Sequence, residues 1–332
     1  MERLSNDELR EQLGTRRDSL QAAIARVGRG EELIALLREV DAALEKIDNG
    51  TYGLCETCHE SIEEERLAVD PLIRNCLDHL TAAEQRMLEY DLDLAHQVQS
   101  ALLPKQGRIS RSWTAAHYYE PAGSVSGDYL DILVSDPLRD SFFFLVGDVT
   151  GKGVAASILM SNLHAIFRTL TRTPASLAHL LEQANRLFCE WTTSRYFATL
   201  ASGRVTGDGT IEFASAAHPP PLLLTASGVR TLDATGLPLG MFCSATYHAI
   251  QHPVDPGDTL VLYTDGLTEA RDASDCDYGL DHLSRLLAGI RREPPEQIVR
   301  AVVRDIQTFR GTSGKLDDLS LLVLQRNRLP AE

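Results

Sequence analysis

The chain has 332 residues, of which 43% are hydrophobic and 24% are charged. This composition supports a packed interior and excludes a chain that is disordered throughout. The 47 acidic and 32 basic residues give a formal net charge of −15, which argues against nucleic acid as a partner. The length favours two domains, although one large α+β domain with appendages also fits.

Two features of the sequence bear on the cellular compartment. No run of about 18 apolar residues occurs, and residues 1–5 lack the apolar core of a signal peptide. We therefore expect a cytoplasmic protein without a membrane partner.

Three of the six cysteines cluster between residues 55 and 76, and the others stand alone at Cys189, Cys243 and Cys276. Under reducing conditions these three are expected to be free, inert thiols.

The first 50 residues have the pattern of a helical hairpin. Apolar residues recur at helical spacing from Leu4 to Val27, and residues 28–30 interrupt the pattern with two glycines. A second helical pattern runs from Glu31 to Ile47 and stops at Asn49-Gly50. We therefore expect two helices joined by a short turn.

A long amphipathic helix is predicted over residues 81–103. Thr81 and Glu84 have the spacing of a capping box, and the apolar stripe continues to Pro104. A helix between two modules can transmit rotation or pair with its copy in a homodimer. Packing against the domain that follows is an equally good alternative.

Beyond Gly107 the pattern changes to short β-like runs, for example at 141–146, 196–200 and 259–263. Gly207-Asp208-Gly209 marks a hairpin turn, so antiparallel pairing is expected. Helical patterns cover about 154–173, 176–193, 277–289 and 294–309. Strands and helices come in blocks, which favours an α+β fold over a doubly wound parallel sheet.

Four aspartates lie at or beside the ends of predicted strands. A carboxylate at the end of an apolar strand is costly unless its charge is compensated, and adjacent glycine lets a ligand approach the backbone. Mg²⁺ and Mn²⁺ bind such carboxylates together with carbonyl oxygens and water. Each Asp-Gly pair alone is typical of a solvated turn, but four together favour a metal site. The acids are Asp128, Asp148, Asp265 and Asp317.

These acids stand in motifs that resemble PPM-type phosphatases of the bacterial SpoIIE/RsbU group. The resemblance covers about residues 95–326, in matching order, and includes the lead-in Ala95–Pro104. The motifs are SGDYLD at 126–131, GDVTGKGVAA at 147–156, AHPP at 217–220, LPLG at 237–240, LYTDGLTE at 262–269 and DDLS at 317–320.

The resemblance implies an αββα sandwich of two antiparallel sheets with two Mn²⁺ or Mg²⁺ ions at one edge. Asp148 would bridge the ions, the Val149 carbonyl would add a ligand, and Asp128, Asp265 and Asp317 would complete the site. Asp318 competes with Asp317 for its role, and Asp131 is a further acid of the motif.

The implied reaction is hydrolysis of phosphoserine or phosphothreonine on a regulatory protein, such as an anti-sigma-factor antagonist, by a metal-activated water. Ser126 stands where the group usually has glycine. Lys152 occupies a position where the group has histidine or lysine, and it is either a phosphate contact or a solvated loop residue. No arginine matches the phosphate-binding arginine of the eukaryotic type 2C branch. His218 is expected to stabilise the turn before Pro219-Pro220.

Two loops resemble nucleotide-binding motifs only loosely. Residues 151–156 fit G-x-G-x-x-A between a strand and a helix, but no acid follows about 20 residues later. Residues 311–315 lack the glycine spacing and the hydroxyl residue of a P-loop. Nucleotide binding is therefore not predicted.

The early cysteines have the spacing of a structural zinc site. Cys55 and Cys58 form one pair of ligands, and Cys76 and His79 form the other, with seventeen residues between the pairs. His59 is an alternative fourth ligand, and three free thiols would be the non-metal interpretation.

Residues 35–80 resemble the DksA/TraR zinc-finger family, with histidine in place of the last cysteine. In that family a coiled-coil hairpin can enter the RNA polymerase secondary channel, but here the arms are short and the tip has no acidic pair. Residues 1–80 carry 18 acids and 10 bases, a net charge of −8, which disfavours DNA binding.

We expect three regions: a hairpin with zinc finger at 1–80, a linker helix at 81–106 and a phosphatase domain at 107–326. The alternative function is a noncatalytic regulator whose zinc module docks a partner such as RNA polymerase.

Overall fold

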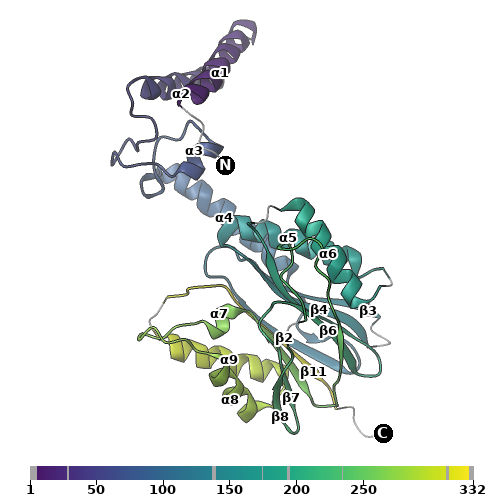
Figure 1. Ribbon diagram of the computed structural model, residues 1–332. Helices are drawn as coiled ribbons and strands as arrows, with labels where there is room; N and C mark the ends of the chain where they lie inside the picture. Colours follow the sequence, from purple (N-terminus) through teal and green to yellow (C-terminus); the bar gives the residue numbers. More distant parts are fainter. Residues whose placement is uncertain are drawn as a thin grey trace. The chain divides into compact units, whose positions relative to one another are not determined.

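The computed structural model describes residues 6–27, 30–136, 140–173, 175–192, 195–233, 235–311 and 314–328 (Figure 1). It divides into two compact units, Met1–Asp91 and Leu92–Glu332. Among the residues described, no helix is both long and apolar enough to cross a bilayer. The boundaries expected at residues 80 and 106 stay a prediction.

The first unit contains the expected helix pair, α1 (Asn6–Val27) and α2 (Glu31–Asp48). Leu9, Leu13 and Leu20 of α1 pack with Val40 and Ala43 of α2 in one buried cluster. Leu4 and the turn at 28–29 lie outside the described residues. A short helix α3 (Glu64–Val69) and a 3₁₀ turn at Leu77–His79 follow.

The helix predicted at 81–103 is α4 (Ala82–Leu102), and its capping box has formed. The Glu84 N–H donates to Thr81 Oγ1 at 3.2 Å, and the Thr81 N–H donates to Glu84 Oε2 at 2.8 Å. These two hydrogen bonds satisfy backbone donors that a helix start leaves unpaired, so they fix where the helix begins.

The second unit contains two antiparallel sheets. One has the order β1-β2-β11-β10-β7-β8 and the other β3-β4-β5-β6-β9. The strands of the first sheet are β1 (Gly107–Arg108), β2 (Trp113–Glu120), β7 (Leu222–Thr225), β8 (Gly228–Thr231), β10 (Thr259–Tyr263) and β11 (Leu319–Arg326). Those of the second are β3 (Asp128–Asp136), β4 (Ser141–Val149), β5 (Ala198–Val205), β6 (Thr210–Ala216) and β9 (Ile250–Pro253).

Helices cover the outer faces of both sheets, as Figure 1 shows. One cluster packs α5 (Gly153–Leu170) and α6 (Leu177–Trp191) on the five-stranded sheet. Another packs α8 (Leu280–Ile290) and α9 (Pro295–Arg310) on the six-stranded sheet, and a third fills the space between the sheets. A single-turn helix, α7 (Asp265–Thr268), follows β10. The expected αββα sandwich is therefore confirmed.

The turn at Gly207–Gly209 joins β5 to β6 as predicted, and the antiparallel pairing excludes the doubly wound alternative. The helix expected at 277–289 instead begins at Leu280. Gly279 precedes it with a φ of 76°, and Tyr278 is buried beneath it. A residue with a positive φ cannot form part of a right-handed α-helix, so the helix starts after Gly279.

The prediction of free thiols was wrong for two cysteines. Cys189 near the end of α6 and Cys243 form a disulfide, although 54 residues separate them. Asn185 of α6 brings the loop that carries Cys243 close to Cys189. Its Oδ1 accepts from the Gly240 N–H at 2.8 Å, and its Nδ2 donates to the Phe242 carbonyl at 2.8 Å. The loop after Gly240 is thereby held against α6. Cys276 is a free, exposed thiol.

Candidate metal centres

The fold brings the four predicted aspartates to one edge of the sandwich. Asp128 and Asp148 are directly opposite in the β3–β4 pair. Asp265 begins α7 immediately after β10, and Asp317 stands two residues before β11, the strand that pairs with β10. Each sheet therefore contributes two of the acids.

Among the described residues, no positive side chain pairs with the buried carboxylate of Asp128. It is only 2% exposed, and its Oδ2 accepts hydrogen bonds from Thr264 Oγ1 at 2.9 Å and Ser320 Oγ at 2.6 Å. Burial and repulsion from Asp148 raise its pKa well above the ordinary value, despite these hydroxyls. Sequence reasoning missed both hydroxyl groups as site residues, although each stands in a motif beside a predicted acid.

Asp148 and Asp265 are also carboxyl groups that lie near other acids and are largely removed from solvent. Burial and repulsion from Asp265 and Asp317 raise the pKa of Asp148 to about 8. Burial and repulsion from Asp317 also raise the pKa of Asp265. Lys152 opposes both effects, and its Nζ lies 3.2 Å from Asp317 Oδ2 and donates to the Leu316 carbonyl. One ammonium cannot neutralise these acids, so the charge balance fits divalent cations.

Asp317 and Asp318 have different environments. Asp318 is 7% exposed, and its two oxygens accept from the Ala122 N–H at 2.7 Å and the Gly127 N–H at 2.9 Å. Asp317 is half-exposed beside Lys152, and it repels Asp148 and Asp265. Asp317 therefore interacts with the other acids of the edge, whereas Asp318 holds the loop before β3.

Gly127 leaves space where the resemblance places two ligand oxygens. A Cβ at this position would lie 2.8 Å from the Val149 carbonyl oxygen and 3.4 Å from Asp148 Oδ1. Ala198 lies opposite Val149 in the β4–β5 pair, but its N–H donates to the Leu239 carbonyl and not to the Val149 carbonyl. The Val149 carbonyl oxygen therefore accepts no hydrogen bond from Ala198, which fits a role as a ligand.

The raised pKa of Asp148 predicts how stability depends on pH. Its folded-state pKa of about 8 exceeds the ordinary 3.8, so the folded protein binds a proton more tightly than the unfolded chain. Without added cation, the contribution of Asp148 to the free energy of unfolding should therefore be largest below about pH 4. It should fall as the pH rises to about 8. Mn²⁺ competes with that proton, and its stabilising effect should be larger at about pH 8 than at about pH 6.

Thermal unfolding at both pH values, with and without Mn²⁺, would measure this effect. Asp148→Asn has no titrating group and should flatten the pH dependence. An equal dependence in the wild type and in Asp148→Asn would contradict the assignment.

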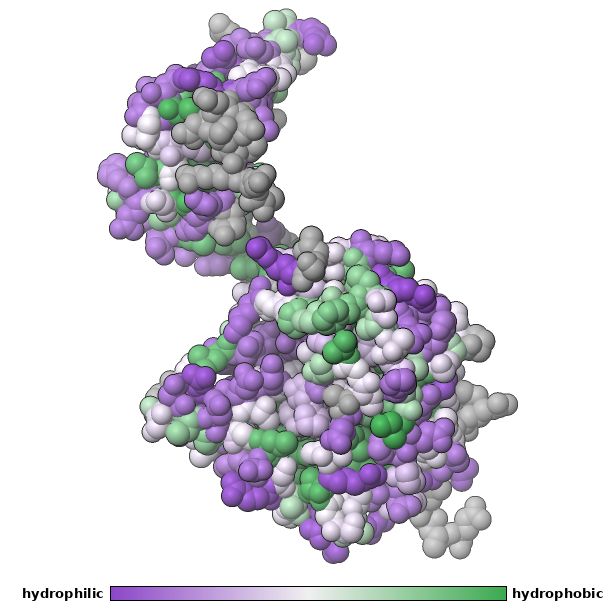
Figure 2. All heavy atoms as spheres, in the orientation of Figure 1, coloured by the Kyte–Doolittle hydropathy of each residue, from purple (hydrophilic) through white to green (hydrophobic). Residues whose placement is uncertain are grey.

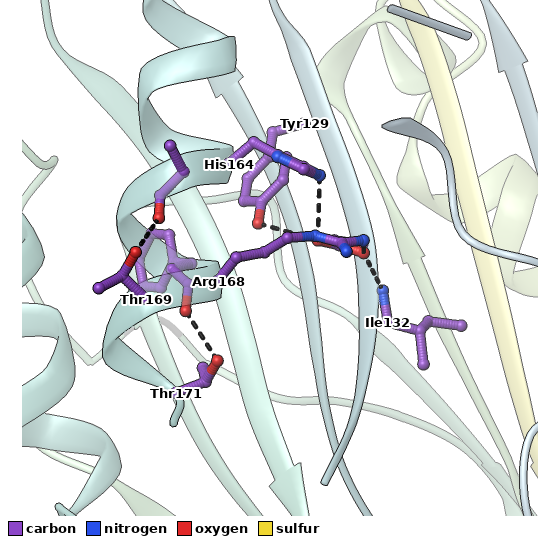
Figure 3. Close-up of polar contacts among 9 residues, drawn as sticks. Tyr129, Ile132, His164, Arg168, Thr169 and Thr171 are labelled. Carbon is purple, nitrogen blue, oxygen red and sulfur yellow. Dashed lines mark hydrogen bonds and ion pairs between the residues drawn. The ribbon is translucent and has the colours of Figure 1, made fainter. Parts of the chain in front are cut away.

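Asp131, the further acid of the first motif, belongs to a different cluster. It is fully buried and paired with Arg168 of α5, whose Nε and Nη2 donate to its Oδ2 and Oδ1, each at 3.0 Å. Tyr129 Oη donates to Oδ2 at 3.4 Å, and His164 Nε2 lies 3.5 Å from the same oxygen. Figure 3 shows Tyr129, His164 and Arg168 directed toward one another. Asp131 therefore anchors α5 on β3.

His218 lies near the acids but is held in a structural role. It is 2% exposed, and its Nδ1 lies 2.9 Å from Thr199 Oγ1 on the strand beside Asp148. Burial lowers its pKa to about 3, which keeps the imidazole neutral. Its backbone N–H donates to Ser215 Oγ at 3.3 Å, which ties the residue into the turn after β6.

The predicted zinc ligands also come together. The ligand atoms of Cys55, Cys58, Cys76 and His79 all lie within 4.8 Å of one another, whereas His59 is exposed and not in the group. Cys76 Sγ is 3.8 Å from Cys58 Sγ and 3.2 Å from His79 Nδ1. In the described part of the chain this is the one set of Cys, His, Asp and Glu side chains whose ligand atoms lie so close together, and the acids at the sheet edge are spaced more widely.

The environment of Cys55 favours a thiolate. Burial of this side chain raises its pKa, but backbone N–H groups of Cys58, Cys76 and Thr57 outweigh burial and lower the pKa to about 6. Two cysteine knuckles facing each other, with a thiolate among their donors, fit one tetrahedral Zn²⁺.

Comparison with known proteins identifies relatives for both units. Residues 50–78 match the prokaryotic dksA/traR C4-type zinc finger. Protein IcfG of Synechocystis is 25% identical over 267 residues, which are 71% of this chain and 42% of that protein. Phosphoserine phosphatase RsbU of Bacillus subtilis is 27% identical over 190 residues, 56% of each chain. The chain thus spans about half the length of these curated relatives.

Solved structures agree with the fold. The RsbU and RsbW domains of Rv1364c from Mycobacterium tuberculosis superpose with a TM-score of 0.58 and 28% identity, over 68% of this chain and 63% of that one. The SiaA-PP2C domain of Pseudomonas aeruginosa, at 20% identity, has a TM-score of 0.65 over 75% of this chain and the whole of the other, and supports the fold alone. Residues 139–327 match the model of Stage II sporulation protein E (SpoIIE). Because that match covers more than half of the chain, the protein belongs to the SpoIIE family.

Proposed function

We propose that this protein is a metal-dependent protein phosphatase that hydrolyses phosphoserine or phosphothreonine on a regulatory protein. The observation that carries the proposal is the gathering of acids from both sheets at one edge, with Lys152 as the cation that opposes the charge of Asp148 and Asp265. A site with this excess of negative charge fits two divalent cations, which we take to be Mn²⁺ or Mg²⁺.

The residues of the edge divide into ligands and groups that orient them. We propose Asp128, Asp148, Asp265 and Asp317, with the Val149 carbonyl, as ligands, and Asp318 as the residue that orients the loop before Asp128. Two bound cations lower the pKa of a shared water and stabilise charge on phosphoryl oxygens. Lys152, beside Asp317, is near enough to the acids to attract the phosphate group of a substrate.

The substrate class is inferred from the relatives. RsbU and RsbP of Bacillus subtilis, 27% and 25% identical to this chain over their matched regions, are called phosphoserine phosphatases. By analogy we propose a phosphorylated regulatory protein in the cytoplasm, such as an anti-sigma-factor antagonist. This part of the proposal is an analogy of function within one fold family.

The test is phosphate release from a phosphoserine peptide and from phenyl phosphate by the full chain, with and without added Mn²⁺. Release that rises with Mn²⁺ concentration supports a metal-dependent enzyme. A folded protein that binds Mn²⁺ but releases no phosphate from either compound would favour the alternative, a noncatalytic regulator that uses the zinc module to dock a partner such as RNA polymerase.

For the first unit we propose one structural Zn²⁺ bound by Cys55, Cys58, Cys76 and His79. Such a site stabilises a small domain that lacks a large core. The core of this part of the chain is indeed small, with Ile62 packed beside the buried Cys55 and Cys76.

We also propose that α4 pairs with its copy in a homodimer. Its apolar side chains Met87, Tyr90 and Leu94 are 68%, 68% and 48% exposed, and they follow heptad spacing. Arg86 and Asp91 are exposed at flanking positions where parallel helices exchange opposite charges. Figure 2 shows polar and apolar side chains intermixed over the visible face of each unit.

Dimerisation predicts a change of mass in one variant. Leu94→Glu places a charge in the helix pair and should convert a dimer into a monomer, measured by light scattering during size-exclusion chromatography. Glu89→Gln, at an exposed position of the same helix away from the apolar stripe and its flanking positions, should leave the dimer intact. A monomeric wild type at micromolar concentration would refute the pairing.

A further inference from the structure

Gln99 is a buried polar side chain on the long helix α4, outside the group of acids at the sheet edge. It is 5% exposed. Its Nε2 donates to the Ser126 carbonyl at 2.7 Å, and its Oε1 accepts from the Ser126 N–H at 3.0 Å. One carboxamide therefore pairs with both backbone groups of Ser126, as a neighbouring strand would. Because Ser126 is fully buried, loss of the amide would leave two backbone groups unpaired.

Ser126 is the first of three residues whose N–H groups are each held by a side chain. The Gly127 N–H donates to Asp318 Oδ2 at 2.9 Å, and the Asp128 N–H donates to Ser126 Oγ at 3.0 Å. Gln99 holds the Ser126 N–H. Gln99 and Asp318, from two separate parts of the chain, and the Ser126 hydroxyl thus fix the backbone that leads into Asp128, and the group on α4 is Gln99.

The position of this backbone determines the shape of the acid centre. Gly127 lies so close to Val149 and Asp148 that a Cβ on it would be 2.8 Å from the Val149 carbonyl oxygen and 3.4 Å from Asp148 Oδ1. The Val149 N–H in turn donates to the Gly127 carbonyl at 3.3 Å. A shift of Ser126 would therefore move Gly127 against these oxygens and turn the carboxylate of Asp128.

We propose that Gln99 is a positioning residue for the acid centre, which acts through Ser126 to set the geometry in which the aspartates bind divalent cations. It touches neither cation nor substrate. The inference rests on the proposed function only in taking the acids as cation ligands. A residue that merely anchored α4 would affect stability and leave cation affinity unchanged.

The test compares Mn²⁺ affinity of full-length variants in the absence of substrate. Gln99→Met keeps the length and helix propensity but removes both hydrogen bonds, and Gln99→Glu keeps an acceptor for the Ser126 N–H but loses the donor to its carbonyl. Each should weaken Mn²⁺ binding by on the order of tenfold, as is typical when a group that orients ligands is removed. Electron paramagnetic resonance of free Mn²⁺ measures this, with Asp148→Ala as the blank for binding elsewhere.

Gln97→Met is the matched control, because Gln97 is exposed on the same helix and should bind Mn²⁺ as the wild type does. Circular dichroism identifies any variant that fails to fold, and Gln99→Glu then serves if Gln99→Met does not fold. Wild-type Mn²⁺ affinity in a folded Gln99 variant with a lowered Tm would overturn the proposal in favour of a simple anchor.

The outcome is separate from that of the proposed function. If the wild type binds Mn²⁺ but releases no phosphate, the phosphatase proposal fails and the Gln99 comparison is still decisive. If the wild type shows no Mn²⁺ binding above the Asp148→Ala blank, the positioning role is overturned as well.

Discussion

Asp148→Ala is expected to reduce Mn²⁺-dependent phosphate release by on the order of 10³-fold, a size typical of losing one group that stabilises developing charge. Asp148 stands opposite Asp128 in the strand pair and repels both Asp265 and Asp317, so it is the acid that borders all the others. Mn²⁺ affinity should fall together with the rate.

Asp281→Ala is a suitable control, because Asp281 is an exposed acid on α8 and should not affect phosphate release. Steady-state release of phosphate from the phosphopeptide, measured over a range of Mn²⁺ concentrations, separates lost affinity from lost rate. Activity within about threefold of wild type in Asp148→Ala would contradict the proposed role of Asp148 as a cation ligand.

The second large effect is expected from Cys55→Ser combined with Cys58→Ser. We expect about one Zn²⁺ per chain in the wild type and essentially none in this variant. Zinc in small domains contributes about 10–16 kcal/mol of apparent binding energy, so residues 50–79 should lose their fold. Metal analysis of the purified chain and hydrogen exchange of this segment would measure both consequences.

Cys276→Ser provides the control, because this exposed thiol lies in the other unit and should leave the zinc content unchanged. His79→Ala and His59→Ala distinguish the fourth ligand, and only the first should release zinc. An unchanged zinc content in the double cysteine variant would refute the ligand set.

Much of the fold could be predicted from local sequence. The capping box at Thr81 and the glycines at 207 and 209 act through neighbouring residues, and both formed as expected. The sandwich was expected from the resemblance carried by the motifs. The disulfide was not predictable, because Cys189 and Cys243 meet only through the packing of a loop against α6.

The grouping of the acids at one sheet edge could be predicted, but the different environments of neighbouring acids could not. Asp317 and Asp318 are adjacent and chemically identical, and only the backbone N–H groups of Ala122 and Gly127 distinguish them. Likewise, Asp131 stands three residues after Asp128, yet its side chain meets Arg168 on the helix side of the sheet. Such differences depend on contacts nearly 200 or nearly 40 residues away in the sequence, which no local pattern encodes.

The hydrogen bonds of Asp128 have a consequence for the mechanics of the sandwich. Asp128 belongs to the five-stranded sheet, while Thr264 and Ser320, which donate to it, belong to the border of the other sheet. Without cations, the acids of the two sheets repel one another across this seam. Binding of the proposed cations would therefore be linked to adhesion between the sheets, and each would strengthen the other. The edge that we propose as the active site is also the edge at which the two layers should separate first.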